Sequence, residues 1–199
     1  MKLYYSPGAC SLADHIALRE AGLSFDIEKV DLKAKKTESG GDYWTVNPKG
    51  YVPALTLDSG ETITENIALL EWIAQQAPKL APAGPLGRTH LLTALAYIST
   101  ELHKNFKPFF AGGSEEEKAK AGAMITKRLQ YLADTMAGDY LFGGEASVAD
   151  AYLFVMLLWA GKNGIKIPDP LPAFVERMKA RPAVQTALAK EGLNKAPAS

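Results

Sequence analysis

Residues 78–87 (PKLAPAGPLG) limit the possible folds of this sequence more than any other segment. Three of these ten residues are proline and two are glycine, so no helix can continue through them. Strand and helix patterns alternate before this segment, whereas beyond it apolar residues recur at helical spacing. We therefore predict an α/β domain over residues 1–77, a linker over residues 78–87 and an all-helical domain over residues 88–199.

The α/β part shows the order strand, helix, strand, a linking segment, strand, strand, helix. Its predicted elements are strands at 2–5, 25–30, 52–57 and 61–64, and helices at 12–21 and 65–76. Gly22 is expected to end the first helix. The Lys-rich segment 33–41 is expected to be a mobile connection. This order predicts a small α/β layer, so the fold class is α/β followed by all-α.

The second part carries two strong helix signals. Apolar residues keep a spacing of three to four from Leu91 to Phe106, and residues 152–159 are apolar on every side, as in a buried central helix. Residues 147–150 (SVAD) match a capping box, which predicts the start of that helix. The tail after Leu193 is expected to be frayed.

Composition excludes several classes of protein. Lys plus Arg and Asp plus Glu are each 22, so the chain lacks the positive charge of a general nucleic-acid binder. No apolar run is long enough for a membrane span or a signal peptide, so we expect a cytoplasmic protein. One cysteine allows no intrachain disulfide, and neither His15 nor His90 has partners at metal-ligand spacing, so no metal site is predicted.

Cys10 lies between the first strand and the first helix, where free backbone N–H groups and the helix dipole favour a thiolate. We therefore expect a lowered pKa for its thiol. The alternative is a buried cysteine that acts as a small hydrophobe. A dithiol redox motif is excluded, because the positions three residues away are Pro7 and Ala13. Any second thiol must come from another molecule.

Three further positions allow a functional and a structural interpretation. A cis Val52–Pro53 bond would present backbone groups to a peptide-like ligand, but an edge-strand proline needs no ligand. With Thr64 as N-cap, Glu65 and Asn66 would open a helix, and they also suit the ammonium and carboxylate of an amino acid. His103 lies beside the apolar stripe of its helix, which suits a cleft wall, although a lone histidine is more often structural.

Five segments together carry a family resemblance. They are residues 6–12 (SPGACSL), 47–55 (NPKGYVPAL), 64–66 (TEN), 100–104 (TELHK) and 147–150 (SVAD). In this order and at these spacings the chain resembles the bacterial beta-class glutathione S-transferases over residues 1–193. The resemblance implies a thioredoxin-like N-terminal domain, an all-helical C-terminal domain and a homodimer.

The resemblance also implies roles for particular residues. Catalysis would involve Cys10 beside the glutathione sulfur, with Ser11 and His103. For glutathione, the resemblance implies that Val52, before a cis Pro53, pairs with the cysteinyl backbone. Glu65 and Asn66 would hold the γ-glutamyl end, and Lys35 the glycine carboxylate. Thr100 and Glu101 would contribute across the dimer interface. Two positions depart from the family pattern: Asn66 is larger than the usual serine or glycine, and Ala96 replaces an asparagine that can reach glutathione.

The implied reaction joins the thiolate of reduced glutathione, a co-substrate, to a small hydrophobic electrophile. We expect the electrophile near Phe106, Phe109, Phe110 and Trp159, and Cys10 as a group that tunes the bound thiol and forms a reversible mixed disulfide with glutathione. One alternative is a glutathione-dependent thiol-disulfide reductase or peroxidase with Cys10 as nucleophile. Another is a non-enzymatic ligand-binding scaffold, which would have no need for this set of residues.

Overall fold

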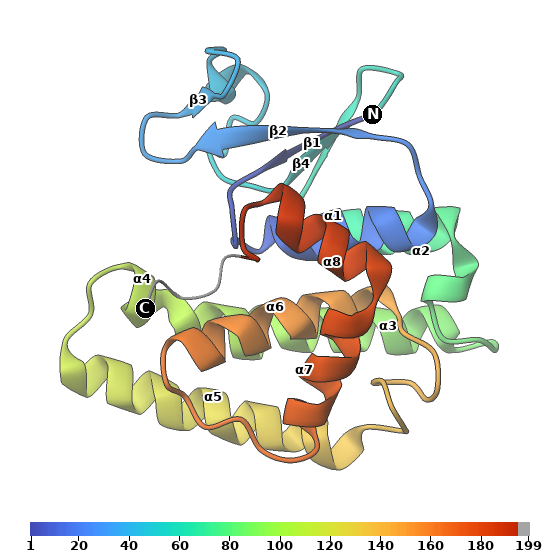
Figure 1. Cartoon of the computed structure of the whole chain (residues 1–199), viewed down its shortest axis with the longest axis vertical. Helices are drawn as coiled ribbons and strands as arrows, with labels where there is room; N and C mark the ends of the chain where they lie inside the picture. Colours follow the sequence, from blue (N-terminus) through green and yellow to red (C-terminus); the bar gives the residue numbers. More distant parts are fainter. Residues whose placement is uncertain (195–199) are drawn as a thin grey trace.

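The computed structural model describes residues 1–194, so most of the tail expected to be frayed lies outside the described residues. Figure 1 shows a sheet above two helices, with the helix of residues 182–190 in front of these two and the other helices forming a larger body beneath them. The strands are β1 (Lys2–Tyr5), β2 (Asp26–Asp31), β3 (Lys36–Thr37), β4 (Ala54–Thr56) and β5 (Thr62–Thr64). The two helices under the sheet are α1 (Ser11–Ala21) and α2 (Asn66–Gln76).

The sheet has the order β3-β2-β1-β4-β5. β1 runs parallel to β2, with Leu3 opposite Ile27, and antiparallel to β4, with Leu3 opposite Leu55. β4 and β5 pair antiparallel around the predicted turn. The first helix ends at Gly22, whose φ of 71° is the left-handed conformation that glycine adopts readily. The predicted α/β order is therefore confirmed.

The segment 33–41 is not the mobile connection that we expected. Part of it forms β3, which pairs with β2, and a short 3-10 helix follows at Tyr43–Thr45. The carboxylate of Glu28, which is buried, accepts hydrogen bonds from the Lys2 ammonium and from the Ser39 hydroxyl. Both bonds lower the pKa of Glu28 to about 2. An ionised carboxylate inside β2 thus fixes the segment, and nothing in the segment's own composition indicates this.

The start of α2 also differs from the prediction. Its N-cap is Glu65, with φ at 76°, and no side chain caps the helix. Thr64, the predicted N-cap, is the last residue of β5. The left-handed backbone at Glu65 turns the chain sharply from strand to helix and leaves the carboxylate free for other partners.

The helical part begins with α3 (Gly87–Tyr97) after a 3-10 turn at Pro78–Leu80. The apolar series that starts at Leu91 stays buried, but its backbone changes to a π-helical turn at Ile98–Leu102 and a 3-10 turn at His103–Phe106. The remaining helices are α4 (Lys107–Phe110), α5 (Glu115–Thr135), α6 (Val148–Lys162), α7 (Leu171–Ala180) and α8 (Pro182–Lys190). π-helical turns often occur at functional sites, and this one ends directly before His103.

α6 is the buried centre of the helical part, as predicted. The predicted capping box starts it: Asp150 accepts hydrogen bonds from the N–H of Ser147 at 2.8 Å and from its hydroxyl at 2.6 Å. α1 packs against both α2 and α6, so one hydrophobic core runs from the sheet through the helical part. None of the described helices is long and apolar enough to cross a membrane.

Candidate functional site

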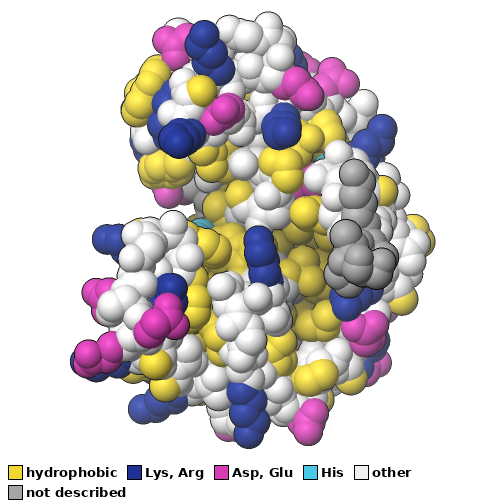
Figure 2. Space-filling view, turned by 60° about the vertical axis from the view of Figure 1, so that its left-hand side comes forward, with side chains coloured by type: hydrophobic (Ala, Val, Ile, Leu, Met, Phe, Trp, Pro, Cys, Tyr) yellow, Lys and Arg dark blue, Asp and Glu magenta, His cyan; other side chains and the backbone are white. Residues whose placement is uncertain are grey.

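A cavity of about 1240 Å³ lies between the sheet end of the molecule and the helical part. Its walls come from the loop after β1, the segment before β4, the first turn of α2, and several helices of the second part. Figure 2 shows this hollow as a band of hydrophobic side chains between two more polar lobes. The cavity exceeds the usual size of a small-molecule site, so it has room for two substrates.

Cys10 lines the middle of the cavity as the N-cap residue of α1. Its thiol donates a hydrogen bond to the carbonyl oxygen of Val52, with 3.5 Å between Sγ and oxygen. Burial raises the pKa of the Cys10 thiol to about 12, and the carboxyl of Asp14 adds to the effect. The prediction of a lowered pKa is therefore wrong, because the loss of water outweighs the backbone N–H groups of the helix start.

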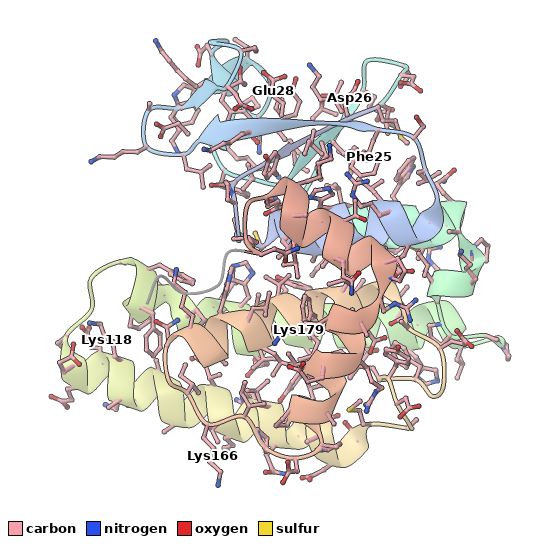
Figure 3. The ribbon with its side chains drawn as sticks, viewed as in Figure 1. Phe25, Asp26, Glu28, Lys118, Lys166 and Lys179 are labelled. Atoms are coloured by element: carbon pink, nitrogen blue, oxygen red, sulfur yellow. The ribbon has the colours of Figure 1, made fainter. Side chains whose placement is uncertain are left out.

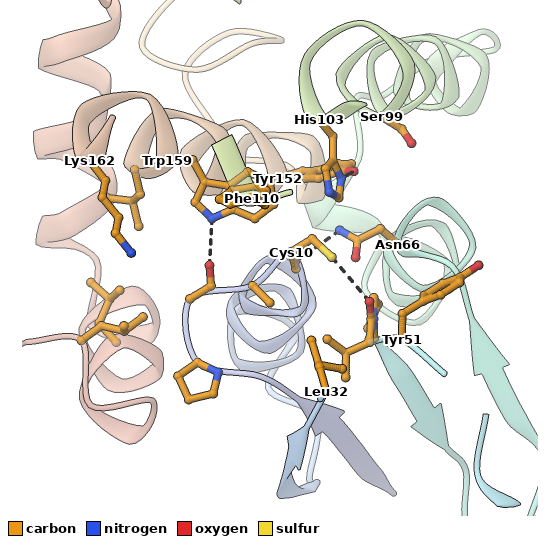
Figure 4. Close-up of a pocket in the computed structure, with 18 of the residues that line it drawn as sticks. Cys10, Leu32, Tyr51, Asn66, Ser99, His103, Phe110, Tyr152, Trp159 and Lys162 are labelled. Atoms are coloured by element: carbon orange, nitrogen blue, oxygen red, sulfur yellow. Dashed lines mark hydrogen bonds between the residues drawn. The ribbon is translucent and has the colours of Figure 1, made fainter. Parts of the chain in front are cut away.

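Val52 and Pro53 line the cavity beside Cys10 and are joined by a cis peptide bond, as predicted. Val52 is buried. Its carbonyl group accepts the thiol hydrogen bond, so the segment before β4 lies against the N-terminus of α1 (Figure 4).

Glu65 and Asn66 line the next part of the cavity wall. The carboxylate of Glu65 accepts hydrogen bonds from the Lys49 ammonium and the Tyr51 hydroxyl, and both lower its pKa. The amide nitrogen of Asn66 donates to the carbonyl oxygen of Cys10 at 3.3 Å. Within residues 1–194 the amide oxygen of Asn66 is buried and has no hydrogen-bond partner. This wall therefore offers a ligand two groups, the carboxylate of Glu65 and the amide oxygen of Asn66, which is a hydrogen-bond acceptor without a partner among the described residues.

His103 lies on the opposite wall, as predicted for a cleft residue, and extends toward Cys10 (Figure 4). Its Nδ1 lies 2.6 Å from the hydroxyl oxygen of Tyr152, and its ring packs edge-on against Trp159 with 5.0 Å between centroids. Burial lowers the pKa of His103 to about 4. The imidazole is therefore neutral at pH 7 and carries one N–H.

The loop before Cys10 is held from two sides at Gly8. Its carbonyl oxygen accepts a hydrogen bond from the indole N–H of Trp159 at 2.8 Å, and its N–H donates to the carboxylate of Glu191 at 2.9 Å. The other oxygen of Glu191 lies 2.9 Å from Nδ1 of His15, and Arg19 donates to Nε2 of that ring. Both α6 and the end of α8 thus fix the position of the Cys10 loop.

Comparisons with known proteins agree with this geometry. Residues 9–76 match the family model "Glutathione S-transferase, N-terminal domain", and residues 95–191 match "Glutathione S-transferase, C-terminal domain". The chain is 45% identical to glutathione S-transferase GstA of Escherichia coli O157:H7 over 97% of this chain and all of that protein. The chain belongs to the glutathione S-transferase family.

Solved structures place this glutathione S-transferase close to the beta class. A sphingomonad glutathione S-transferase complexed with glutathione is 52% identical, with a TM-score of 0.91, over 97% of this chain and all of that one. The beta-class enzyme of Sphingomonas chungbukensis is 49% identical, with a TM-score of 0.88 and the same coverage. The predicted fold class and the predicted family are confirmed.

Other predicted site residues of the transferase do not line this cavity. The hydroxyl of Ser11 is buried and forms hydrogen bonds with the backbone N–H and the carbonyl oxygen of Ser6. It therefore stabilises the loop between β1 and α1. The Lys35 ammonium donates to the carbonyl oxygen of Gly50 and lies 5.5 Å from the Trp44 ring centroid. Neither side chain faces the cavity in this structure.

Thr100 and Glu101 also lie away from the cavity of their own chain. Thr100 donates to the carbonyl oxygen of Ala96 at 3.0 Å, and Glu101 forms an ion pair with Arg128 at 2.8 Å. Their predicted role lies across a dimer interface, so it stays a prediction.

Tyr51 and Tyr152 are among the polar residues of the site that were not predicted from the sequence. Tyr51 lies within the NPKGYVPAL segment, and its position directly before Val52 is the signal that could have found it. Tyr152 lies in the apolar helix α6, where a tyrosine gives no signal of its own. Its importance comes from the contact with His103, which is 49 residues away in sequence.

Proposed function

We infer that this glutathione S-transferase binds glutathione in the cavity and transfers its sulfur to a small hydrophobic electrophile. The observation that carries this conclusion is that one cavity brings together Cys10, Val52, Glu65, Asn66 and His103. These residues come from both parts of the chain and supply groups for the γ-glutamyl end, the cysteinyl backbone and the thiol of a tripeptide.

Glutathione fits the polar wall from Glu65 to Val52. Its γ-glutamyl ammonium would bind the Glu65 carboxylate, and one of its N–H groups would satisfy the buried amide oxygen of Asn66. The cysteinyl backbone would pair with Val52, as in an added strand. Lys35 would reach the glycine carboxylate after it leaves the carbonyl of Gly50.

The sulfur of glutathione would then lie between Cys10 and His103. Cys10 keeps its proton because its pKa is raised, so its S–H can donate a hydrogen bond to a neighbouring thiolate. If Tyr152 donates to Nδ1 of His103, the single N–H of the neutral imidazole lies on Nε2 and can do the same. Two donors near a developing thiolate lower the pKa of glutathione rather than that of Cys10.

The electrophile would occupy the aromatic wall. Phe110 is 58% exposed, and its ring meets Trp159 edge-on at 4.8 Å, so these two rings can hold a flat apolar molecule. The glutathione thiol releases its proton to solvent, the thiolate forms a bond to the electrophilic carbon, and the leaving group departs with the electron pair of the broken bond.

A homodimer agrees with the outward positions of Thr100 and Glu101, which could then serve the partner's cavity. Light scattering would test this assembly, and a monomeric mass would contradict it. We expect the enzyme to act in the cytoplasm, where glutathione is kept reduced.

Glu65→Gln tests the glutathione site in a conjugation assay with a model aryl halide. Loss of the carboxylate is expected to raise the KM for glutathione about tenfold, because a charged hydrogen bond contributes about 1.5–3 kcal/mol. Glu61→Gln is the matched control, since Glu61 is exposed and does not line the cavity. Absence of both conjugation and glutathione binding in the wild type would contradict the proposed function.

The same assay with Cys10→Ala separates conjugation from thiol-disulfide chemistry. Conjugation is expected to persist in part, because His103 remains. Incubation with oxidised glutathione, followed by intact mass, tests the mixed disulfide at Cys10, which the raised pKa of this thiol makes slow at neutral pH. Loss of conjugation with unchanged glutathione binding would instead favour the reductase or peroxidase alternative.

A further inference from the structure

Three lysines line the cavity on the side of the helical part. Lys104 follows His103, Lys162 ends α6, and Lys179 lies on α7. Among the described residues that line the cavity, Glu65 alone is acidic, and Lys49 and Tyr51 already bind its carboxylate. The electrophile side of the cavity is therefore apolar in its wall and positively charged at its rim.

Lys162 lies next to the aromatic wall. It follows Trp159 by three residues, so the two side chains share one face of α6. Figure 4 shows both side chains extending from the same side of α6, and the Trp159 indole donates to the carbonyl oxygen of Gly8. A flat molecule packed on the Trp159 ring is thus beside the Lys162 ammonium.

The charges of the three lysines are compensated to different degrees. Lys179 pairs with Glu176 at 2.9 Å. Neither Lys104 nor Lys162 forms an ion pair with any side chain within residues 1–194. These two ammonium groups remain available to an anion in the cavity.

A lysine in the last turn of a helix also stabilises the helix dipole, and this effect explains a positive charge at the end of α6. It does not require the side chain to line a substrate cavity beside Trp159 and the exposed ring of Phe110. The dipole effect predicts no dependence of activity on substrate charge, so the two roles can be separated by experiment.

On the basis of the proposed transferase function, we propose that the enzyme prefers apolar aromatic electrophiles that carry a carboxylate or a similar anionic group. The aromatic ring packs on Trp159 and Phe110, and Lys162, assisted by Lys104, binds the anion. For an aryl chloride of this kind, the glutathione thiolate forms the carbon–sulfur bond and chloride leaves with the carbon–chlorine electron pair. The anionic group takes no part in bond making and serves only recognition.

The test compares chlorodinitrobenzene with the chlorodinitrobenzoate that carries a carboxylate para to the chlorine. The measured quantity is the ratio of kcat/KM for the anionic electrophile to kcat/KM for the neutral one. Lys162→Met removes the charge and keeps an apolar stem, and Lys162→Arg restores the charge. Lys166→Met is the matched control, because Lys166 lies outside this cavity and extends away from it at the lower edge of the molecule in Figure 3.

Lys162→Met is expected to lower this ratio about two- to fivefold, the effect of one ion pair at an exposed site. Lys162→Arg and Lys166→Met should keep the wild-type ratio. Salt at about 0.5 M should lower the ratio more for the wild type than for Lys162→Met, in which only Lys104 remains to be screened. An equal ratio in wild type and Lys162→Met, or equal losses with both electrophiles, would overturn the proposal.

Binding of unreactive dinitrobenzoate, measured as quenching of tryptophan fluorescence, tests this proposal separately from the transferase function. A wild type that conjugates neither electrophile contradicts the transferase function. Dinitrobenzoate binding that weakens in Lys162→Met still supports the anion site in that case. Binding that is equal in the two proteins overturns the anion site whatever the activity.

Discussion

Nδ1 of His103 and the hydroxyl oxygen of Tyr152 lie 2.6 Å apart at the inner wall of the cavity. The two residues come from different helices, and both are largely shielded from solvent. Burial raises the pKa of Tyr152 and lowers the pKa of His103 to about 4. The hydrogen bond therefore joins two neutral groups and fixes the orientation of the imidazole relative to Cys10.

Tyr152→Phe should lower kcat/KM for conjugation about two- to tenfold. The change removes a neutral hydrogen bond of about 0.5–1.5 kcal/mol and frees the imidazole to rotate. Tyr140→Phe is a matched control, because the Tyr140 hydroxyl accepts a bond from Arg181 outside the cavity. Equal activity of Tyr152→Phe and wild type would show that the orientation of His103 does not matter.

Cys10 should be unreactive in the folded protein near neutral pH. With a pKa of about 12, its thiolate fraction at pH 7 is far below that of an ordinary cysteine. Alkylation by iodoacetamide at pH 7 should therefore be at least about 100-fold slower than that of free glutathione, and it should keep rising up to pH 10. The urea-unfolded protein is the control and should react at an ordinary rate. A plateau below pH 8 would contradict the raised pKa.

Asp14 should reduce stability as the pH rises. Its side chain is fully buried, and within residues 1–194 neither oxygen has a hydrogen-bond partner, so desolvation raises its pKa well above 3.8. A raised pKa in the folded state means that stability is greatest below the unfolded pKa and is lost as pH rises through the folded pKa.

Asp14→Asn removes this titration, so the variant should become more stable relative to wild type from pH 4 upward. The slope is about 1.4 kcal/mol per pH unit until the folded pKa is reached. Urea unfolding across this range measures it, with Asp134→Asn as an exposed control. A stability difference that is constant with pH would show that Asp14 titrates normally.

Asp150→Ala should cost about 2–4 kcal/mol of unfolding free energy. The change leaves the N–H of Leu141 and both donors of Ser147 buried without a partner. The second capping box, Ser114 with Glu117 at the start of α5, is exposed to solvent. Glu117→Ala should therefore cost about 1 kcal/mol or less. Equal costs for the two variants would contradict the effect of burial.

The features that were predicted from the sequence depend on nearby residues. Gly22 ends α1, Ser147 with Asp150 starts α6, and the cis bond before Pro53 was expected from the place of this proline at the start of a strand. The alternation of strand and helix signals was enough to predict the α/β part. The family resemblance was needed to predict which residues meet in the cavity.

The features that were missed depend on contacts between distant residues. The pKa of Cys10 rises because packing removes water, whereas its neighbours in sequence indicated only a helix start. Segment 33–41 is fixed by Glu28, which lies on the preceding strand. Neither effect produces a local pattern in the sequence.

The double attachment of Gly8 has a consequence for synthesis on the ribosome. The loop next to Cys10 is bonded to Trp159 and to Glu191, so residues near the two ends of the chain complete one structure. A nascent chain that has released the whole sheet still lacks these two partners. The cavity can therefore reach its final shape only after translation has passed Glu191, so catalytic competence should appear late.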